Sequence, residues 1–153
     1  MSEKYNFQYC QKIVVYSNDE SSVLLCKRKG EADYDGVYSF IGGKMEAGDE
    51  SIVDGLKREK DEEVGSGFKV RIYPTYSTNA FFVKKDGSRM ILPHYYAVHE
   101  RGEIDLNEEY SEYKWVPLTE IDAFEPKIPN TSEILDKLAI LKEVLSEDDS
   151  VLI

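Results

Sequence analysis

The stretch that most constrains this chain lies between residues 40 and 67, where a glycine-rich segment precedes a charged run with helical apolar spacing. Gly42 and Gly43 stand where the backbone must turn sharply or admit a close neighbour. Apolar residues then recur at helical spacing, and Gly65 follows as a stop signal. The pattern predicts a helix over about residues 50–64 that is entered from a glycine-rich loop.

Three glutamates on this predicted helix, Glu59, Glu62 and Glu63, stand at i, i+3 and i+4 and therefore share one face. Carboxylates this close repel one another, and a hard divalent cation would make the arrangement favourable. Mg²⁺ prefers oxygen ligands and keeps several waters, which leaves room for substrate phosphates. Arg58 is suited to orient a carboxylate through its fork of donors. The ordinary alternative for such a charge run is a solvated acidic helix face.

This segment resembles the Nudix box, a pattern of Gly, five residues, Glu, seven residues and then Arg-Glu-hydrophobic-any-Glu-Glu-any-Gly-hydrophobic. Residues 42–48, with the sequence GGKMEAG, resemble the first half of the box as it commonly appears. The second half matches in register at five positions, which are Arg58, Glu59, Glu62, Glu63 and Gly65. A long pattern with several fixed positions is far more specific than a lone glycine motif.

The match departs from the pattern at the first acid, because one extra residue separates Gly43 from Arg58. Asp49 has the right distance from Gly43, whereas Glu50 has the right distance to Arg58. Either residue can therefore fill the first acidic position. Two further positions that are usually hydrophobic hold polar residues, Lys60 and Ser66.

The resemblance implies an α/β (α+β) fold, a Nudix-like α/β/α sandwich with a central mixed sheet. It also implies Mg²⁺-dependent hydrolysis of a diphosphate bond in a nucleoside diphosphate linked to another moiety, with Mn²⁺ as a substitute metal. The partner would be a small nucleotide, and pairing of two copies into a homodimer is compatible with this kind of domain. The alternative function is a non-catalytic Nudix-like module that binds a nucleotide or nucleotide sugar.

Roles for individual residues follow from the resemblance alone. The carbonyl of Gly43 and the side chains of Glu59, Glu62 and Glu63 would hold the metal. Either Glu59 or Glu62 would act as the catalytic base, and Arg58 would hold a helix glutamate in the correct rotamer.

A later acidic loop is a second source of metal ligands, because some family members bring a glutamate from this region to the metal. Glu109 is the best match, with Glu108 and Glu112 as rivals. A solvent-facing loop acid is the ordinary alternative for each of them.

Length and charge limit the remaining options. At 153 residues the chain has the length of one domain, and we expect residues 1–153 to form a single domain. The net charge of −11 argues against a nonspecific nucleic-acid binder, which normally carries a basic surface. No run reaches the length of a membrane span and the N-terminus is not a signal peptide, so we expect a cytoplasmic protein without a membrane partner.

The rest of the chain alternates between β-prone runs and turns. Strands are predicted at residues 5–16, 23–26, 40–41, 68–73, 79–84, 90–99 and 113–116. We expect the first two to pair as a hairpin. A final helix is predicted over residues 131–145, capped by Thr131 or Ser132, with a frayed segment at 146–150.

Three smaller features carry open alternatives. Residues 27–29 are basic, and they suit either phosphate contact or a solvated strand end. Five aromatic residues could set substrate selectivity without a ranking among them: Tyr34, Tyr38, Tyr76, Phe81 and Tyr95. Cys10 and Cys26 lack metal-binding spacing, so we expect reduced, partly buried thiols.

Overall fold

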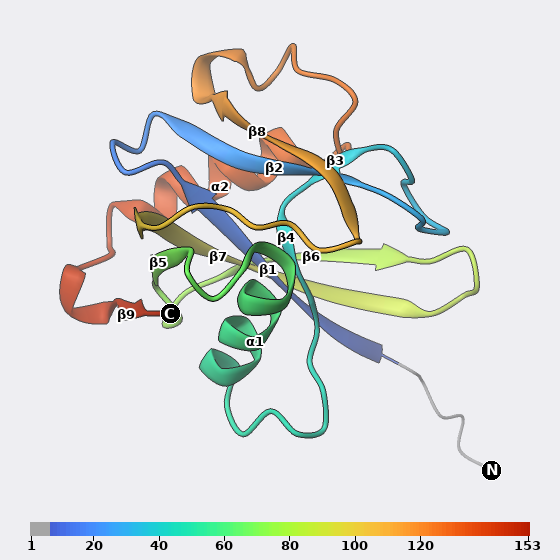
Figure 1. Ribbon diagram of the computed structural model, residues 1–153, viewed down its shortest axis with the longest axis horizontal. Coiled ribbons are helices and arrows are strands. Elements are labelled where there is room, and N and C mark those ends of the chain that lie inside the picture. The colour runs from blue at the N-terminus through green and yellow to red at the C-terminus, as the bar shows by residue number, and fades with distance from the viewer. Residues whose placement is uncertain (1–6) are drawn as a thin grey trace.

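The computed structural model describes residues 7–153, in which nine strands form one mixed sheet with two α-helices packed against it (Figure 1). The strands are β1 (Phe7–Tyr16), β2 (Ser22–Arg28), β3 (Tyr38–Ser39), β4 (Ile41–Lys44), β5 (Lys69–Ile72), β6 (Thr78–Val83), β7 (Arg89–Arg101), β8 (Tyr110–Pro117) and β9 (Val151–Leu152). The helices are α1 (Ile52–Val64) and α2 (Thr131–Lys142), with 3₁₀ turns η1 (Leu118–Glu120) and η2 (Glu147–Asp149).

Strand β1 is the centre of the sheet. It runs parallel to β7 and antiparallel to β4, and it meets β2 only where Tyr16 pairs with Val23. The strand order is β3-β2-β1-β7-β5-β9, with β4 paired to β1, β6 to β7 and β8 to β2. The predicted mixed sheet is confirmed. The predicted hairpin of β1 and β2 is reduced to one residue pair, because β2 pairs along its length with β8.

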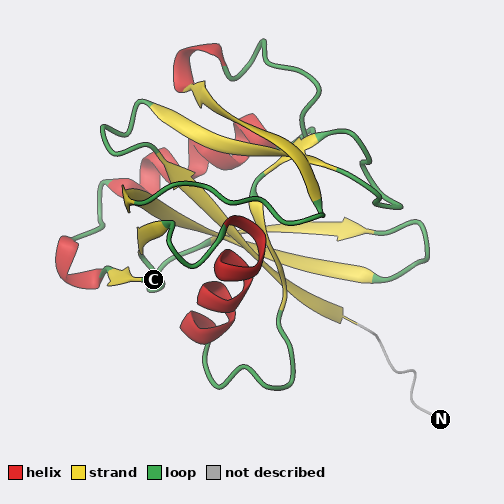
Figure 2. Cartoon of the chain, in the orientation of Figure 1, coloured by secondary structure: helices red, strands yellow, loops and turns green. Residues whose placement is uncertain are grey.

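The side chains of β1 alternate between two apolar clusters on opposite faces of the sheet. Ile13 and Val15 pack in the cluster that contains Leu56 of α1, whereas Val14 packs in the cluster that contains Leu138 of α2. A strand that is buried on both faces needs a continuous apolar run. The result is the predicted α/β/α arrangement, with one helix on each face (Figure 2).

Helix α1 begins two residues later than predicted, at Ile52. The Ser51 hydroxyl accepts a hydrogen bond from the backbone N–H of Asp54 at 3.0 Å and so caps the helix. The side-chain amide of Gln11 on β1 donates to the Ile52 carbonyl at 3.1 Å. Gly65 follows the last turn with φ 96°. The helix is therefore capped at both ends and tied to the central strand.

The glycine pair before α1 lies in strand β4 and not in a loop, so that part of the prediction was wrong. Gly42 has φ 130°, and a Cβ atom there would overlap the Gln11 carbonyl oxygen on β1. A Cβ atom on Gly43 would overlap the Glu59 carboxylate. The two glycines therefore allow β1, β4 and α1 to approach one another closely.

The C-terminal prediction was partly wrong. Helix α2 ends at Lys142, and its N-cap is Asn130 without a side-chain capping bond, so neither Thr131 nor Ser132 caps it. Among the apolar residues of this helix, Ile140 is 72% exposed and does not pack on the sheet. Residues 146–150 are ordered by a capping box at Ser146 and lead into β9, which pairs with β5.

Most other strands start or end a few residues from their predicted positions, as the ranges above show. Strand β8 begins at Tyr110, which is three residues earlier than predicted. Tyr5 and Asn6 of the first predicted strand lie outside the described residues.

Cys10 and Cys26 are free and buried, as expected for reduced thiols. Neither α-helix within residues 7–153 is long and apolar enough to cross a lipid bilayer.

Gly102 provides a test of the fold away from the glutamates. It has φ 88°, and a Cβ atom there would overlap the Gly67 carbonyl oxygen. Gly102→Ala is expected to lower the free energy of unfolding by about 1–3 kcal/mol in urea denaturation. Gly67→Ala is the matched control, because a Cβ atom there meets no atom within 4 Å. Equal effects of the two substitutions would contradict this packing.

Candidate functional site

A cavity of about 750 Å³ opens beside the N-terminal half of β1. Residues of strands β1, β2, β3, β4, β6, β7 and β8 and of both α-helices line it. Glu59 and Glu62 of α1 line it, together with Gly43 of β4. Its volume falls within the range of small-molecule sites, which is roughly 300–1,000 Å³. The predicted acidic helix face therefore borders a ligand-sized cavity.

Arg58 organises the acids around it. Its guanidinium donates to Asp49 through two bonds, Nε to Oδ1 at 2.8 Å and Nη2 to Oδ2 at 3.0 Å. Its Nη1 donates to Glu59 at 2.9 Å and to Glu62 at 3.3 Å. The bidentate bond is the main cause that lowers the pKa of the Asp49 carboxyl to about 2.

This geometry distinguishes the two residues left open at the first acidic position. Asp49 also accepts a hydrogen bond from the Glu46 backbone N–H at 2.8 Å, which fixes it in the turn before α1. Glu50 is exposed and has no hydrogen bond or ion pair within residues 7–153. These contacts favour Asp49 over Glu50 for the first acidic position, with the extra residue after it.

Glu59 and Glu63 converge beneath the glycine pair. Glu59 is 8% exposed and Glu63 is 1% exposed. Glu63 Oε1 accepts hydrogen bonds from the Gly42 backbone N–H, at 3.2 Å, and from the Tyr110 hydroxyl. Burial raises the pKa of the Glu63 carboxyl, and adjacent Glu59 adds to that rise, whereas the charge of Lys12 opposes it.

Glu62 differs from its two neighbours, because its side chain is 54% exposed and turns toward Arg58. Within residues 7–153, no three acidic, histidine or cysteine side chains are already arranged to hold a metal ion. Of the three predicted glutamates, Glu59 and Glu63 are therefore buried and Glu62 is exposed. We use the name carboxylate site for Glu59, Glu62 and Glu63.

The buried pair nevertheless fits a divalent cation. Glu63 Oε2 is buried and has no hydrogen-bond partner. An unpartnered buried carboxylate oxygen is costly, and a proton or a cation would satisfy it. The Glu59 carboxylate lies directly against Gly43, and the carboxylate oxygens of this pair are ligands that suit Mg²⁺ or Mn²⁺.

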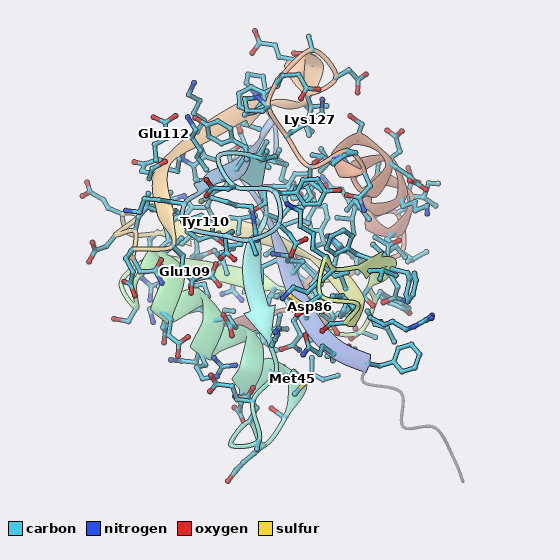
Figure 3. The ribbon with its side chains drawn as sticks, turned by 90° about the vertical axis from the view of Figure 1, so that its right-hand side faces the viewer. Met45, Asp86, Glu109, Tyr110, Glu112 and Lys127 are labelled. Carbon is cyan, nitrogen blue, oxygen red and sulfur yellow. The ribbon has the colours of Figure 1, made fainter. Side chains whose placement is uncertain are left out.

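The acidic loop before β8 packs against the end of α1. The Asn107 backbone N–H donates to the Glu63 carbonyl at 3.1 Å. Figure 3 shows Glu109 and Tyr110 beside each other where β8 begins, with Glu109 nearer to α1. Partial burial, followed by the charges of Glu31 and Glu59, raises the pKa of the Glu109 carboxyl.

Among the three loop acids, the cavity wall includes Glu109 but neither Glu108 nor Glu112. Glu112 instead accepts a hydrogen bond from the Tyr38 hydroxyl. The geometry therefore brings Glu109 to the same cavity as the carboxylate site, and it leaves the two rivals outside.

Of the basic cluster, the cavity wall includes Arg28 but not Lys27 or Lys29. Tyr34 and Phe81 line the cavity, and Tyr34 packs at a tilt on Phe82 with ring centroids 5.6 Å apart. The other three aromatic candidates, Tyr38, Tyr76 and Tyr95, lie outside it.

Sequence reasoning missed several residues that line this cavity, above all Lys12, Ser39 and Tyr110. Lys12 is 8% exposed, and the Ser39 hydroxyl is buried without a hydrogen-bond partner. One signal was available for Lys12, because it alternates in register with the inward-facing Val14 and Tyr16 of β1.

The two histidines have different surroundings. His94 is buried in the cavity wall, its Nδ1 lies 2.8 Å from the Leu92 carbonyl, and its ring meets Phe40 edge-on. Burial, followed by the charge of Lys12, lowers the pKa of His94 to about 4, so His94 is neutral at pH 7. His99 stacks on Phe68 with ring centroids 4.6 Å apart, as a packed residue would.

Comparisons with known proteins agree with the sequence pattern. A family model described as NUDIX domain matches residues 10–138. No curated protein sequence matches this chain. Many solved structures do, and the three described next share between 16% and 20% of their residues with it, which indicates a shared fold alone.

The first is the MutT protein from Methanosarcina mazei Go1, with a TM-score of 0.75, 20% identity and coverage of 93% of this chain and 99% of that one. An Ap4A hydrolase binary complex from C. elegans has a TM-score of 0.71 and 16% identity, and covers 90% and 99%. The NUDIX domain of Shewanella oneidensis NrtR, complexed with ADP ribose, has a TM-score of 0.64 and 16% identity, and covers 95% and 91%.

The contacts of Asp49 predict how acid affects stability. The folded-state pKa of Asp49 is about 2, below its ordinary value of 3.8. Ionised Asp49 therefore stabilises the fold fully above about pH 4, and this contribution is lost as the pH falls toward 2. Asp49→Asn should lower the free energy of unfolding at pH 7 and flatten its acid decline, measured by urea denaturation at several pH values. Glu50→Gln should match the wild type at every pH, and a similar loss in both variants would contradict the assignment.

Proposed function

This chain belongs to the NUDIX domain family, and on that basis we propose that it hydrolyses a diphosphate bond with Mg²⁺ as cofactor. The proposed substrate is a nucleoside diphosphate linked to another moiety. The observation that carries the proposal is the buried pair Glu59 and Glu63. The Glu59 carboxylate lies against Gly43 at the wall of a ligand-sized cavity, and Glu63 Oε2 is buried without a hydrogen-bond partner.

In this proposal Glu59, Glu62, Glu63 and the Gly43 carbonyl hold the metal, with Glu109 from the loop before β8 as a further ligand. Mg²⁺ supplies charge neutralisation for the diphosphate and makes an attacking water more acidic. Arg58 is a positioning residue, because it keeps Glu59 and Glu62 at the cavity through the hydrogen bonds of its guanidinium. Glu62 would complete the site by giving up its hydrogen bond to Arg58 and binding the metal instead.

The reaction needs one proton acceptor. The oxygen of a water molecule forms a bond to phosphorus while the anhydride P–O bond breaks, and the leaving phosphate keeps the electron pair. The proton of the water passes to a carboxylate, for which Glu59 and Glu62 are the two candidates. Glu62 is the more accessible of the two, because its side chain is 54% exposed.

The cavity favours a small nucleotide over a polymer as substrate. Cationic side chains of Lys12, Arg28 and Lys44 line it together with the Phe40 and His94 rings. Cations suit phosphate groups, and ring faces accept a base of any kind. The net charge of −11 over the whole chain opposes a long polyanion.

Glu63→Gln tests the metal-holding role. With Mg²⁺ and a panel of nucleoside triphosphates, dinucleotides, ADP-ribose and sugar nucleotides, the wild-type protein is expected to release phosphate-containing products. Glu63→Gln and Glu62→Gln should each lower the best turnover rate by about a hundredfold or more, because each removes one charge from the metal-holding set. The measurement is chromatographic separation of substrate and products over time.

Glu50→Gln is the matched control, since Glu50 lies next to the site and contacts none of its residues. A chelator should abolish turnover, and added Mg²⁺ should restore it. Unchanged turnover in both glutamate variants would rule out the proposed site. Metal-dependent ligand binding without any product after long incubation would instead assign the chain to the non-catalytic binding modules.

A further inference from the structure

Lys12 is a buried cation at the wall of the cavity. It lies on β1 and is 8% exposed. Its ammonium donates one hydrogen bond, to the Phe40 carbonyl at 3.3 Å, and it forms no ion pair within residues 7–153. A lysine ammonium has three donors, so this single long bond leaves donor capacity unused.

Burial without an ion-pair partner is unfavourable for an ammonium group. An anion that enters the cavity would supply the missing partner. The neighbouring acids form no ion pair with Lys12, although its charge opposes the rise that burial causes in the pKa of Glu63 and of Glu109. Lys12 therefore affects both acids through its charge alone, and its one hydrogen bond goes to the Phe40 carbonyl.

Strand pairing gives the position of Lys12 relative to the carboxylate site. Its partner on β4 is Gly42, whose backbone N–H holds Glu63, and its partner on β7 is His94. Neighbouring strands lie about 4.8 Å apart, so Lys12 stands one strand from each of them. On one side are the carboxylates, and on the other is the His94 ring with Phe40 edge-on to it.

We propose that Lys12 is a substrate-binding residue whose ammonium contacts the phosphate group between the bond that breaks and the ring-lined end of the cavity. This inference rests on the proposed function and adds a specificity determinant to it. The contact requires a phosphate at that position, so Lys12 selects substrates whose diphosphate extends from the carboxylate site toward His94. In this role Lys12 contacts the phosphate and transfers no proton.

A scaffold role is the competing explanation, in which Lys12 serves only to balance the charge of Glu63. The two roles predict opposite effects on metal binding. If Lys12 only supports Glu63, its removal should weaken metal binding. If Lys12 instead binds phosphate, its removal should leave metal binding unchanged or make it tighter, because one positive charge near the metal is lost.

The test measures binding without turnover. Inorganic pyrophosphate is titrated by calorimetry into metal-free protein with a chelator present, and Mn²⁺ is titrated separately by electron paramagnetic resonance. Lys12→Met, close to lysine in length, should weaken pyrophosphate binding about tenfold or more, since a hydrogen bond to a charged group is lost. Lys12→Arg keeps the charge and should stay within about threefold of the wild type.

Lys137→Met is the charge-matched control, because Lys137 lies on the solvent side of α2 with its side chain 49% exposed. It should leave both titrations unchanged. Urea denaturation confirms that each variant is folded.

The proposal is overturned if Lys12→Met binds pyrophosphate like the wild type, or if the wild-type protein binds none. A loss of Mn²⁺ affinity in Lys12→Met also overturns it, in favour of the scaffold role. Failure of the proposed hydrolysis would leave these titrations intact, so the two proposals are tested separately.

Discussion

The close approach of β4 to β1 is the constraint on which the site depends. Gly42 adopts φ 130° against the Gln11 carbonyl, and its backbone N–H then points at Glu63 Oε1. Gly43 leaves room for the Glu59 carboxylate directly against the strand. A side chain at Gly42 would separate β4 from β1, and a side chain at Gly43 would displace the Glu59 carboxylate. The glycines therefore bury two carboxylates side by side, which is unfavourable until a cation joins them.

Two cations with different partners surround this pair. Arg58 is bonded to Asp49 and to two members of the carboxylate site, so its charge is already paired. Lys12 lies on β1, paired with Gly42 of β4, and has no ion pair within residues 7–153. The paired cation suits a positioning role and the unpaired cation suits ligand contact. Both arrangements come from β1, β4 and α1, the elements that also build the core.

Much of the fold could be predicted from local sequence, and the site only in part. Apolar periodicity located α1, α2 and most strands, because each buries one or two faces. It missed β9, since a two-residue strand is too short to show a period, and it placed Gly42 and Gly43 in a loop. The helical spacing of Glu59, Glu62 and Glu63 predicted that they share one face of α1. Their unequal burial depends on β4 and Tyr110, which are distant in sequence. Lys12 was hidden in an apolar run.

The proposed metal site places a divalent cation between Glu59, Glu63 and the Gly43 carbonyl. The most direct measurement is a crystal structure of the protein grown with Mn²⁺, with anomalous diffraction data collected at the manganese edge. We expect an anomalous peak that is coordinated by both carboxylates, with Glu62 turned from Arg58 toward the metal. An absent peak, or one bound only by exposed surface acids, would contradict it.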